Sequence, residues 1–364
     1  MQPVFLQGLQ DVGDEAVAST VRNIILQATG DLSWLSNGDT VLLKPALNSP
    51  DPYPATTHPA VVQATAALCA ERGARVVIGD QSGIEHVLHH PGGVLRGSTA
   101  ANFVCSGMAV PGDPRFIGFE DGGWDGGFFH YRSGRTASWK DGFFITTRVK
   151  EADHIISLPR VSSHSMAGAT LGFKNMVGLL REDSRMEFHA NGPMNPFILR
   201  SAGGSSLVSH DDGSSRFFEK IVEISDAVRD KLRLTLSAAT VVPATFGPDR
   251  YGIRLGPAGL GRAYTVLPPS GLVFCSADPV AAEAMALAVL KDSRHSVPFL
   301  SLTLERLALF KNPLSRLLDS TAVRDHPYIR HATAIGLGTM EGQRLVAKDV
   351  PAGYLKRLCS LTGW

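Results

Sequence analysis

The feature that most constrains the fold is a strand, helix and strand pattern in residues 40–80. Residues 40–44 read T-V-L-L-K and residues 75–80 read R-V-V-I-G-D, short apolar and β-branched runs typical of strands. Residues 59–72 between them carry a helical pattern that begins with Pro, which suits a first helical turn. Such units form parallel sheets buried on both faces. We therefore predict an α/β fold whose ligands bind beyond the carboxyl ends of the strands, where Lys44 and Asp80 stand.

Similar patterns continue along the 364 residues of the chain. Apolar spacing predicts helices over 14–30 and 217–232, and strands over 143–148, 154–158, 232–236 and 272–276. Another helix begins at Pro279 with Asp278 as its cap, and Glu283 on it is expected to face solvent or a cation such as Lys44 or Lys174. After residue 298 the chain is predicted to be helical and then to form a short strand over 331–338.

We expect two lobes with mainly parallel, Rossmann-like βαβ sheets and a cleft between them. The N-terminal lobe spans residues 1–160 and contains an irregular Gly- and aromatic-rich insertion at 107–142. Residues 161–215 carry a polar site segment and then a Ser- and Gly-rich stretch, 201–215, which is predicted to be a mobile loop. Residues 216–364 form the C-terminal lobe.

Composition excludes several classes of protein. Hydrophobic residues make up 44% and charged residues 19% of the chain, which excludes a disordered chain. The 35 Lys and Arg residues nearly balance 34 Asp and Glu residues, so the basic field that nucleic-acid binding requires is missing. No secretory signal is visible at the start, and no apolar run reaches the roughly 18 residues of a membrane span. We expect a cytoplasmic protein without a nucleic-acid or membrane partner.

The cysteines argue against an iron-sulfur cluster and a zinc ribbon. Cys69, Cys105, Cys275 and Cys359 lie far apart and form no C-x-x-C pair. We expect free thiols, which a reducing cytoplasm maintains. The identity of any other cofactor stays open.

The most unusual stretch is L-P-R-V-S-S-H-S-M-A-G-A-T-L-G-F-K-N-M-V-G-L-L, residues 158–180. It gathers Arg160, His164, Thr170, Lys174 and Asn175 among small residues that let a ligand approach the backbone. We interpret it as a binding or catalytic site. The alternative is that His164 caps a strand, Lys174 is a solvated charge and the glycines serve only turns.

These motifs resemble the domain of unknown function 362 family. The resemblance covers residues 40–290 and rests on the following runs: V-L-L-K-P-A-L-N-S-P at 41–50, R-V-V-I-G-D-Q-S-G at 75–83, A-D-H-I-I-S-L-P at 152–159 and S-A-D-P-V-A-A-E-A at 276–284. The family pattern Pro-Lys-x-Lys-x-His, then Thr-x-x-x-Lys-Asn-x-x-Gly, is kept at His164, Thr170, Lys174, Asn175 and Gly178. Arg160 and Ser162 replace its two lysines, which removes one positive charge and implies an altered substrate. Many members carry an appended iron-sulfur cysteine segment, which this chain lacks.

A weaker resemblance concerns lactate-racemase-type proteins, which hold a nickel-pincer nucleotide. His164, Lys174 and His189 follow one another at intervals of ten and fifteen residues, similar to the His, Lys and His order there. In those proteins the lysine carries the cofactor covalently, and histidines act as metal ligands or as acid and base.

Other histidines offer a less specific metal site. His86, His89 and His90 follow the Asp80 loop, and together with Asp80 they offer ligands for a zinc or iron site. His86 and His90 would share a helix face, although Pro91 argues against a helix there. His58 is expected to cap the helix that begins at Pro59 rather than to bind a ligand.

We therefore expect an enzyme that acts on a small polar, carboxylate-bearing metabolite, as an isomerase, lyase or transferase. His164 and His189 would act as acid, base or metal ligand, and Lys174 as clamp or nucleophile. The expected substrate-binding residues are Lys44, Asp80, Arg160, Thr170 and Asn175, with the cations holding an anionic group. The alternatives are a non-catalytic small-ligand or cofactor-binding protein and a nickel-pincer-type racemase or epimerase.

Overall fold

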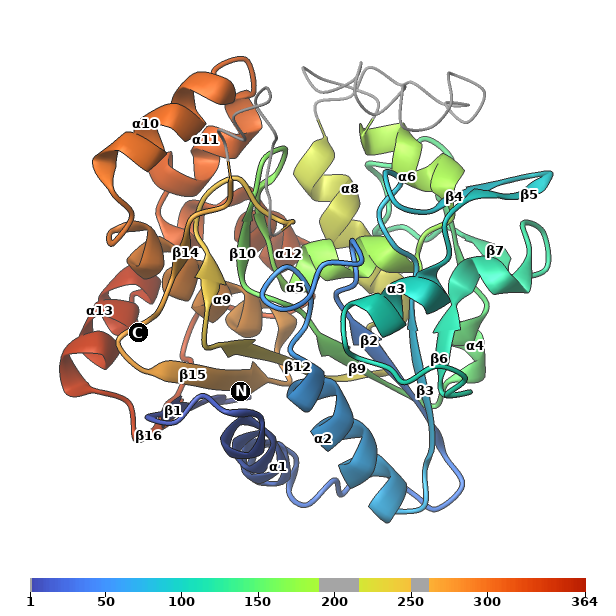
Figure 1. Cartoon of the computed structure of the whole chain (residues 1–364), viewed down its shortest axis with the longest axis horizontal. Helices are drawn as coiled ribbons and strands as arrows, with labels where there is room; N and C mark the ends of the chain where they lie inside the picture. Colours follow the sequence, from blue (N-terminus) through green and yellow to red (C-terminus); the bar gives the residue numbers. More distant parts are fainter. Residues whose placement is uncertain (1, 190–215, 250–261) are drawn as a thin grey trace.

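A mixed sheet of eight strands forms the centre of the computed structural model, which describes residues 2–189, 216–249 and 262–364 (Figure 1). From one edge to the other the strands are β16 (Leu345–Lys348), β1 (Val4–Leu9), β15 (Gly271–Ser276), β12 (Leu232–Ala239), β9 (His154–Leu158), β2 (Thr40–Pro45), β3 (Arg75–Asp80) and β6 (Phe116–Gly118). The five strands from β12 to β6 are parallel, whereas β15 is antiparallel to both neighbours. The predicted α/β fold with a mainly parallel sheet is confirmed.

Apolar side chains of alternate strand residues enter two cores, one on each face of the sheet. In β2, Val41 and Leu43 contribute to one core and Leu42 to the other, as the pleat of a strand requires. The first core is covered by α1 (Asp14–Thr29), α2 (Pro59–Glu71) and α3 (Thr99–Cys105). The second is covered by α5 (Gly172–Asn175), α6 (Glu182–His189), α8 (Phe217–Glu223), α9 (Pro279–Arg294), α12 (Pro327–Ala334) and α13 (Ala352–Thr362).

Shorter elements surround these layers. Two-stranded sheets pair β4 (Leu88–His90) with β5 (Gly93–Arg96), β7 (Phe128–Tyr131) with β8 (Phe143–Thr146), β10 (Ser162–His164) with β11 (Gly168–Thr170), and β13 (Val242–Pro243) with β14 (Thr265–Val266). The remaining helices are α4 (Arg148–Glu151), α10 (Phe299–Ala308) and α11 (Pro313–Ser320). None of the helices within the described ranges is long and apolar enough to cross a membrane.

Strands from both predicted lobes are neighbours in the main sheet, where β12 pairs with β9. The proposed divisions near residues 160 and 216 therefore do not separate two sheets. Within 107–142 the chain supplies the edge strand β6 and then β7 of the antiparallel β7–β8 pair. The predicted mobile loop, 201–215, lies outside the described residues.

The predicted strand over 331–338 is wrong, because residues 327–334 form α12. The His326 side chain accepts a hydrogen bond from the Tyr328 N–H as the helix cap, and Pro327 occupies the first turn. Tyr328, Ile329 and Ala332 are buried, a helical spacing that outweighs the local run of small and β-branched residues. The helix predicted over 217–232 is also shorter, since α8 ends at Glu223 and a 3-10 turn, Ile224–Val228, follows.

Two predicted helix caps are confirmed. Asp278 accepts hydrogen bonds from the backbone N–H groups of Val280 and Ala281 at 2.8 and 3.0 Å. His58 Nδ1 accepts one from the Ala60 N–H at 3.2 Å. Both side chains satisfy donors that a helix N-terminus leaves without partners.

Candidate functional site

A cavity of about 510 Å³ lies at the carboxyl ends of β2, β3 and β9, the position predicted for ligands of such a sheet. Its lining includes all eight residues that the sequence predicted to be catalytic or substrate-binding, although they come from segments up to 145 residues apart. These are Lys44, Asp80, Arg160, His164, Thr170, Lys174, Asn175 and His189. The cavity volume suits a small organic molecule.

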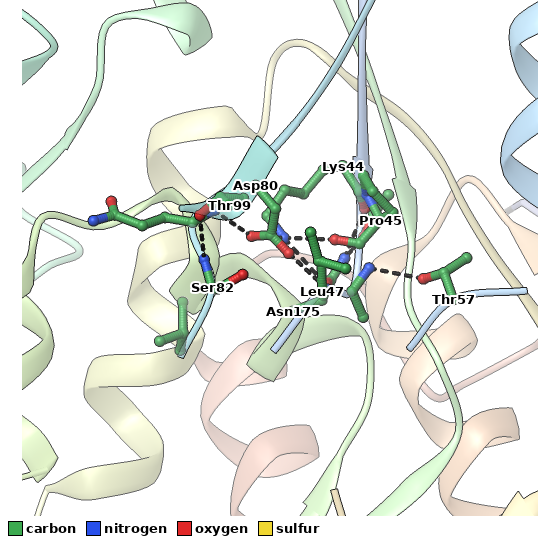
Figure 2. A network of polar contacts seen from close by, with 12 residues as sticks. Lys44, Pro45, Leu47, Thr57, Asp80, Ser82, Thr99 and Asn175 are labelled. Atoms are coloured by element: carbon green, nitrogen blue, oxygen red, sulfur yellow. Dashed lines mark hydrogen bonds and ion pairs between the residues drawn. The ribbon is translucent and has the colours of Figure 1, made fainter. Parts of the chain in front are cut away.

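Lys44 and Asp80 form a buried ion pair on one side of the cavity, with 2.7 Å between Nζ and Oδ1 (Figure 2). Lys44 Nζ also donates to Pro45 O at 2.7 Å and to Asn175 Oδ1 at 3.2 Å. Asp80 accepts from the Leu47 N–H at 2.7 Å. Since every ammonium hydrogen of Lys44 has an acceptor, this lysine joins the strand ends rather than offering a free hydrogen to a ligand.

Gly178 is required beside this pair. A Cβ atom there would overlap Asp80 Oδ1 and lie 2.7 Å from Lys44 Nζ. Asn175, on the same segment, donates through Nδ2 to Lys44 O and to Ser157 Oγ. The Asn and Gly of the Lys-Asn-x-x-Gly motif thus fix the segment that carries Lys174 against β2 and β9.

The segment that sequence analysis singled out folds as the β10–β11 hairpin followed by the short helix α5, which carries Lys174. Glu283 of α9 holds the start of α5, because its Oε2 accepts from the Phe173 N–H at 3.0 Å. Glu283 is fully buried, and its burial raises the pKa of the carboxyl group to about 8. The prediction that Glu283 faces solvent or a cation is therefore wrong, because α9 packs with this side chain against the α5 backbone.

Backbone hydrogen bonds determine which nitrogen of His164 carries the proton. Nδ1 accepts from the N–H groups of Met166 and Ala167 at 3.0 and 3.2 Å, so the neutral ring carries its proton on Nε2. Burial, and then the charge of Lys174, lower the pKa of His164 well below 6.5. His164 is consequently a neutral hydrogen-bond donor through Nε2, and this atom offers no lone pair to a metal ion.

His189 has the opposite tautomer. Its Nδ1 lies 2.8 Å from Arg185 O. A carbonyl oxygen can only accept, so Nδ1 carries the proton and Nε2 presents a lone pair. That Nε2 lies 3.4 Å from Lys174 Nζ. Burial and the charge of Lys174 lower the pKa of His189 well below 6.5, which leaves a neutral proton acceptor beside the amine.

Lys174 is 8% exposed and has no carboxylate within 4.0 Å among the described residues. Burial, followed by the positive charges of Arg160 and Arg185, lowers the pKa of its amine to about 7. An uncharged, nucleophilic amine is therefore more accessible at neutral pH here than on an ordinary lysine.

Arg160 is a second buried cation. Burial lowers the pKa of its guanidinium group to about 10, and the charges of Asp249 and Asp80 act against that lowering. It is 4% exposed, its Nη1 donates to Ala55 O, and its buried Nε has no hydrogen-bond partner. In the described parts of the chain Nη2 has no partner either, and no carboxylate lies within 4.0 Å of the guanidinium group. A buried charge of this kind is stabilised by an anion.

Sequence reasoning missed Arg185, Glu85 and Asp249, which also line the cavity. Arg185 donates to the carbonyl groups of Gln81, Ser82 and Val177 and so fixes α6 to the loop after β3. No local pattern distinguishes Arg185 or Asp249, because each reaches the cavity only through packing of distant segments.

The metal site suggested by the histidines differs from the arrangement in the structure. Possible ligand atoms of Glu85, His86 and Asp249 lie within 4.8 Å of one another, so these three residues could hold a metal ion. Asp80 instead pairs with Lys44. His90 lies on strand β4, not on a helix face shared with His86.

Comparison with known proteins identifies a family. The family model described as "Domain of unknown function (DUF362)" matches residues 41–288, more than half of the chain. The thylakoid-associated protein sll1697 of Synechocystis sp. (strain PCC 6803) is 25% identical over 225 residues, which cover 60% of this chain and 58% of that protein. The chain therefore spans less than two thirds of the relative's length.

Proposed function

Because the chain belongs to the DUF362 family, whose description assigns no reaction, we propose a function from the cavity itself: the protein is an enzyme that acts on a small carboxylate-bearing metabolite. One observation carries this proposal. The guanidinium group of Arg160, whose buried Nε has no hydrogen-bond partner, and the amine of Lys174, which contacts His189, line one cavity. The guanidinium group of Arg160 suits an anionic group of a substrate, and the amine of Lys174 suits the substrate atom at which the reaction takes place.

The two histidines supply the acid and base functions. His189 Nε2 accepts a proton, and the Nε2–H of His164 stabilises negative charge that develops on a substrate oxygen. This assignment supports acid–base chemistry with lysine assistance; in a nickel-pincer-type racemase only His189, whose Nε2 presents a lone pair, would be suited to bind the metal. We also place the protein in the cytoplasm, because all four cysteines are free thiols.

Calorimetric titration with small mono- and dicarboxylates, and with the corresponding neutral amides, tests the proposal. We expect carboxylates to bind and Arg160→Gln to weaken them at least about 30-fold, because removing one side of a buried charge pair costs 2 kcal/mol or more. Arg22→Gln is the matched control, since Arg22 forms an exposed ion pair with Glu71 away from the cavity.

The opposing results are equally specific. Equal affinity for carboxylates and amides, or no effect of Arg160→Gln, would contradict the proposed anion site. NMR spectra of the bound acids before and after incubation distinguish turnover from binding alone, and unchanged spectra for every bound acid would favour the non-catalytic binding protein.

A further inference from the structure

We propose that Lys174 forms a Schiff base with the carbonyl carbon of a 2-oxo acid whose carboxylate binds Arg160. This inference rests on the proposed function and names its substrate class. It requires an accessible amine without a counter-ion, an anion site in the same cavity, and groups that move the proton of the attacking amine. The described residues supply each of these.

Among the described residues that line the cavity, Lys174 is the one lysine that meets the amine requirement. Lys44, the second lysine in the lining, is joined to Asp80 and to two carbonyl oxygens. Lys174 contacts the nitrogen of His189 instead of a carboxylate. Because an ammonium group cannot attack a carbonyl carbon, only the amine of Lys174 is suited to covalent chemistry.

The anion site limits the substrate. Arg160 and Lys174 line one cavity, and the charge of Arg160 acts on the Lys174 amine. A ligand that uses both groups carries an anionic group close to an electrophilic carbon. In a 2-oxo acid the carboxylate is bonded directly to the carbonyl carbon, so one small molecule satisfies both sites in a cavity of about 510 Å³.

The covalent step can be written with the observed tautomers. The nitrogen of Lys174 attacks C2, the N–C bond forms, and the carbonyl π electrons move to oxygen, where the Nε2–H of His164 stabilises the charge. His189 Nε2 takes one proton from the attacking nitrogen and returns it to that oxygen. The resulting carbinolamine hydroxyl takes a second proton from solvent and leaves as water, while the nitrogen lone pair completes the iminium.

Reductive trapping tests this step on the full chain. The protein is incubated at pH 7 with pyruvate or 2-oxoglutarate and sodium cyanoborohydride, and intact mass and peptide mapping locate the reduced adduct. We expect one adduct per chain, on Lys174. At pH 7 the uncharged fraction of this amine exceeds that of an ordinary lysine on the order of a thousandfold. Propionate, which lacks the carbonyl group, should compete without forming an adduct.

Two results would overturn the Schiff base. One is an adduct spread over surface lysines, and the other is no adduct with acids that calorimetry shows to bind in an Arg160-dependent manner. The second result leaves the proposed carboxylate site intact, whereas absence of binding overturns both proposals. Lys174→Met should abolish the adduct, with circular dichroism as the test of folding. Peptide mapping of the unaltered protein decides the question without that variant.

Discussion

Two buried lysines line the same cavity, and they differ in their partners. Lys44 lies on β2 and has a carboxylate, an amide oxygen and a backbone carbonyl as acceptors. Lys174 lies on α5 and has a neutral histidine 3.4 Å away. Both are nearly inaccessible to solvent, so burial alone does not separate a structural lysine from a reactive one.

The difference follows from which segments meet at each lysine. Adjacent parallel strands bring Lys44 and Asp80 together at their carboxyl ends. Burial lowers the pKa of Lys44, and the opposite charge of Asp80 acts against that lowering. The charges of Arg160 and Arg185 act on both lysines. Lys174 contacts His189 of α6 rather than a carboxylate, so nothing comparable to Asp80 offsets the burial and like charges that disfavour its ammonium form. The contacts of Lys44 join the ends of β2 and β3, and those of Lys174 leave an amine suited to the proposed reaction.

The largest expected effect is the loss of stability on Lys44→Met. The substitution leaves Asp80 buried without its cation, and breaking a buried pair from one side costs about 3–5 kcal/mol. Urea denaturation monitored by circular dichroism measures the free energy of unfolding. Lys174→Met is the matched control and should change it by less than about 1.5 kcal/mol, because Met replaces an amine that has no carboxylate partner. Equal losses would remove the distinction between the two lysines.

The second-largest expected effect is a difference in amine reactivity between Lys174 and the surface lysines. Competitive labelling with acetic anhydride, followed by peptide mass spectrometry, measures the uncharged amine at each pH. Labelling of Lys174 should rise with a midpoint near pH 7, because burial and two neighbouring arginines lower its pKa to about 7, whereas surface lysines titrate near about 10.4. Arg160→Gln should move the midpoint upward, since it removes a like charge. A midpoint near that of surface lysines would contradict the assignment.

Glu283 tests whether the position of α5 depends on α9. Glu283→Ala should cost about 1–3 kcal/mol, because it leaves the Phe173 N–H without its acceptor. Glu283→Gln keeps an acceptor and provides the control. Glu283→Gln also alters the pH dependence of the free energy of unfolding, because it removes the titrating carboxyl group.

The sign of that pH dependence follows from the raised pKa. Burial raises the folded-state pKa of Glu283 to about 8, above the unfolded value of about 4.3. The folded state therefore binds more protons than the unfolded state between these values, and the contribution of Glu283 to stability falls as pH rises from about 4 to about 8. Glu283→Gln should gain stability relative to the unaltered chain across this range. A constant difference would show that the carboxyl group does not titrate there.

The sequence allowed prediction of much of this arrangement because its signals are local. The β2, α2 and β3 units, and the Leu-Pro break after β9, placed Lys44, Asp80 and Arg160 at adjacent strand ends. Whether Lys44 or Lys174 is paired could not be predicted, because it depends on side-chain contacts between different elements, 36 residues apart for Lys44 and Asp80 and 15 for Lys174 and His189. The same holds for Asp249, whose carboxylate accepts from Asn48.

The tautomers of the histidines were also beyond sequence analysis. That of His164 depends on two N–H groups of the β10–β11 turn, and that of His189 on a carbonyl one helical turn earlier. Which backbone group lies beside a given ring nitrogen is determined only when the chain is folded. The spacing of His164, Lys174 and His189 indicated which residues to examine, but not which nitrogen donates.

Asp278→Ala should give the smallest effect and leave both lysines unchanged. Asp278 caps α9 and also accepts from the Thr339 N–H at 3.0 Å, but it does not line the cavity. Loss of a helix cap costs about 1 kcal/mol, so urea denaturation should show a modest loss, which Asp278→Asn should partly restore. The pH midpoint for labelling of Lys174 should not move. A shifted midpoint, or a large loss of carboxylate affinity, would mean that the α9 N-terminus acts on the cavity and that the contrast between the two lysines extends beyond their own contacts.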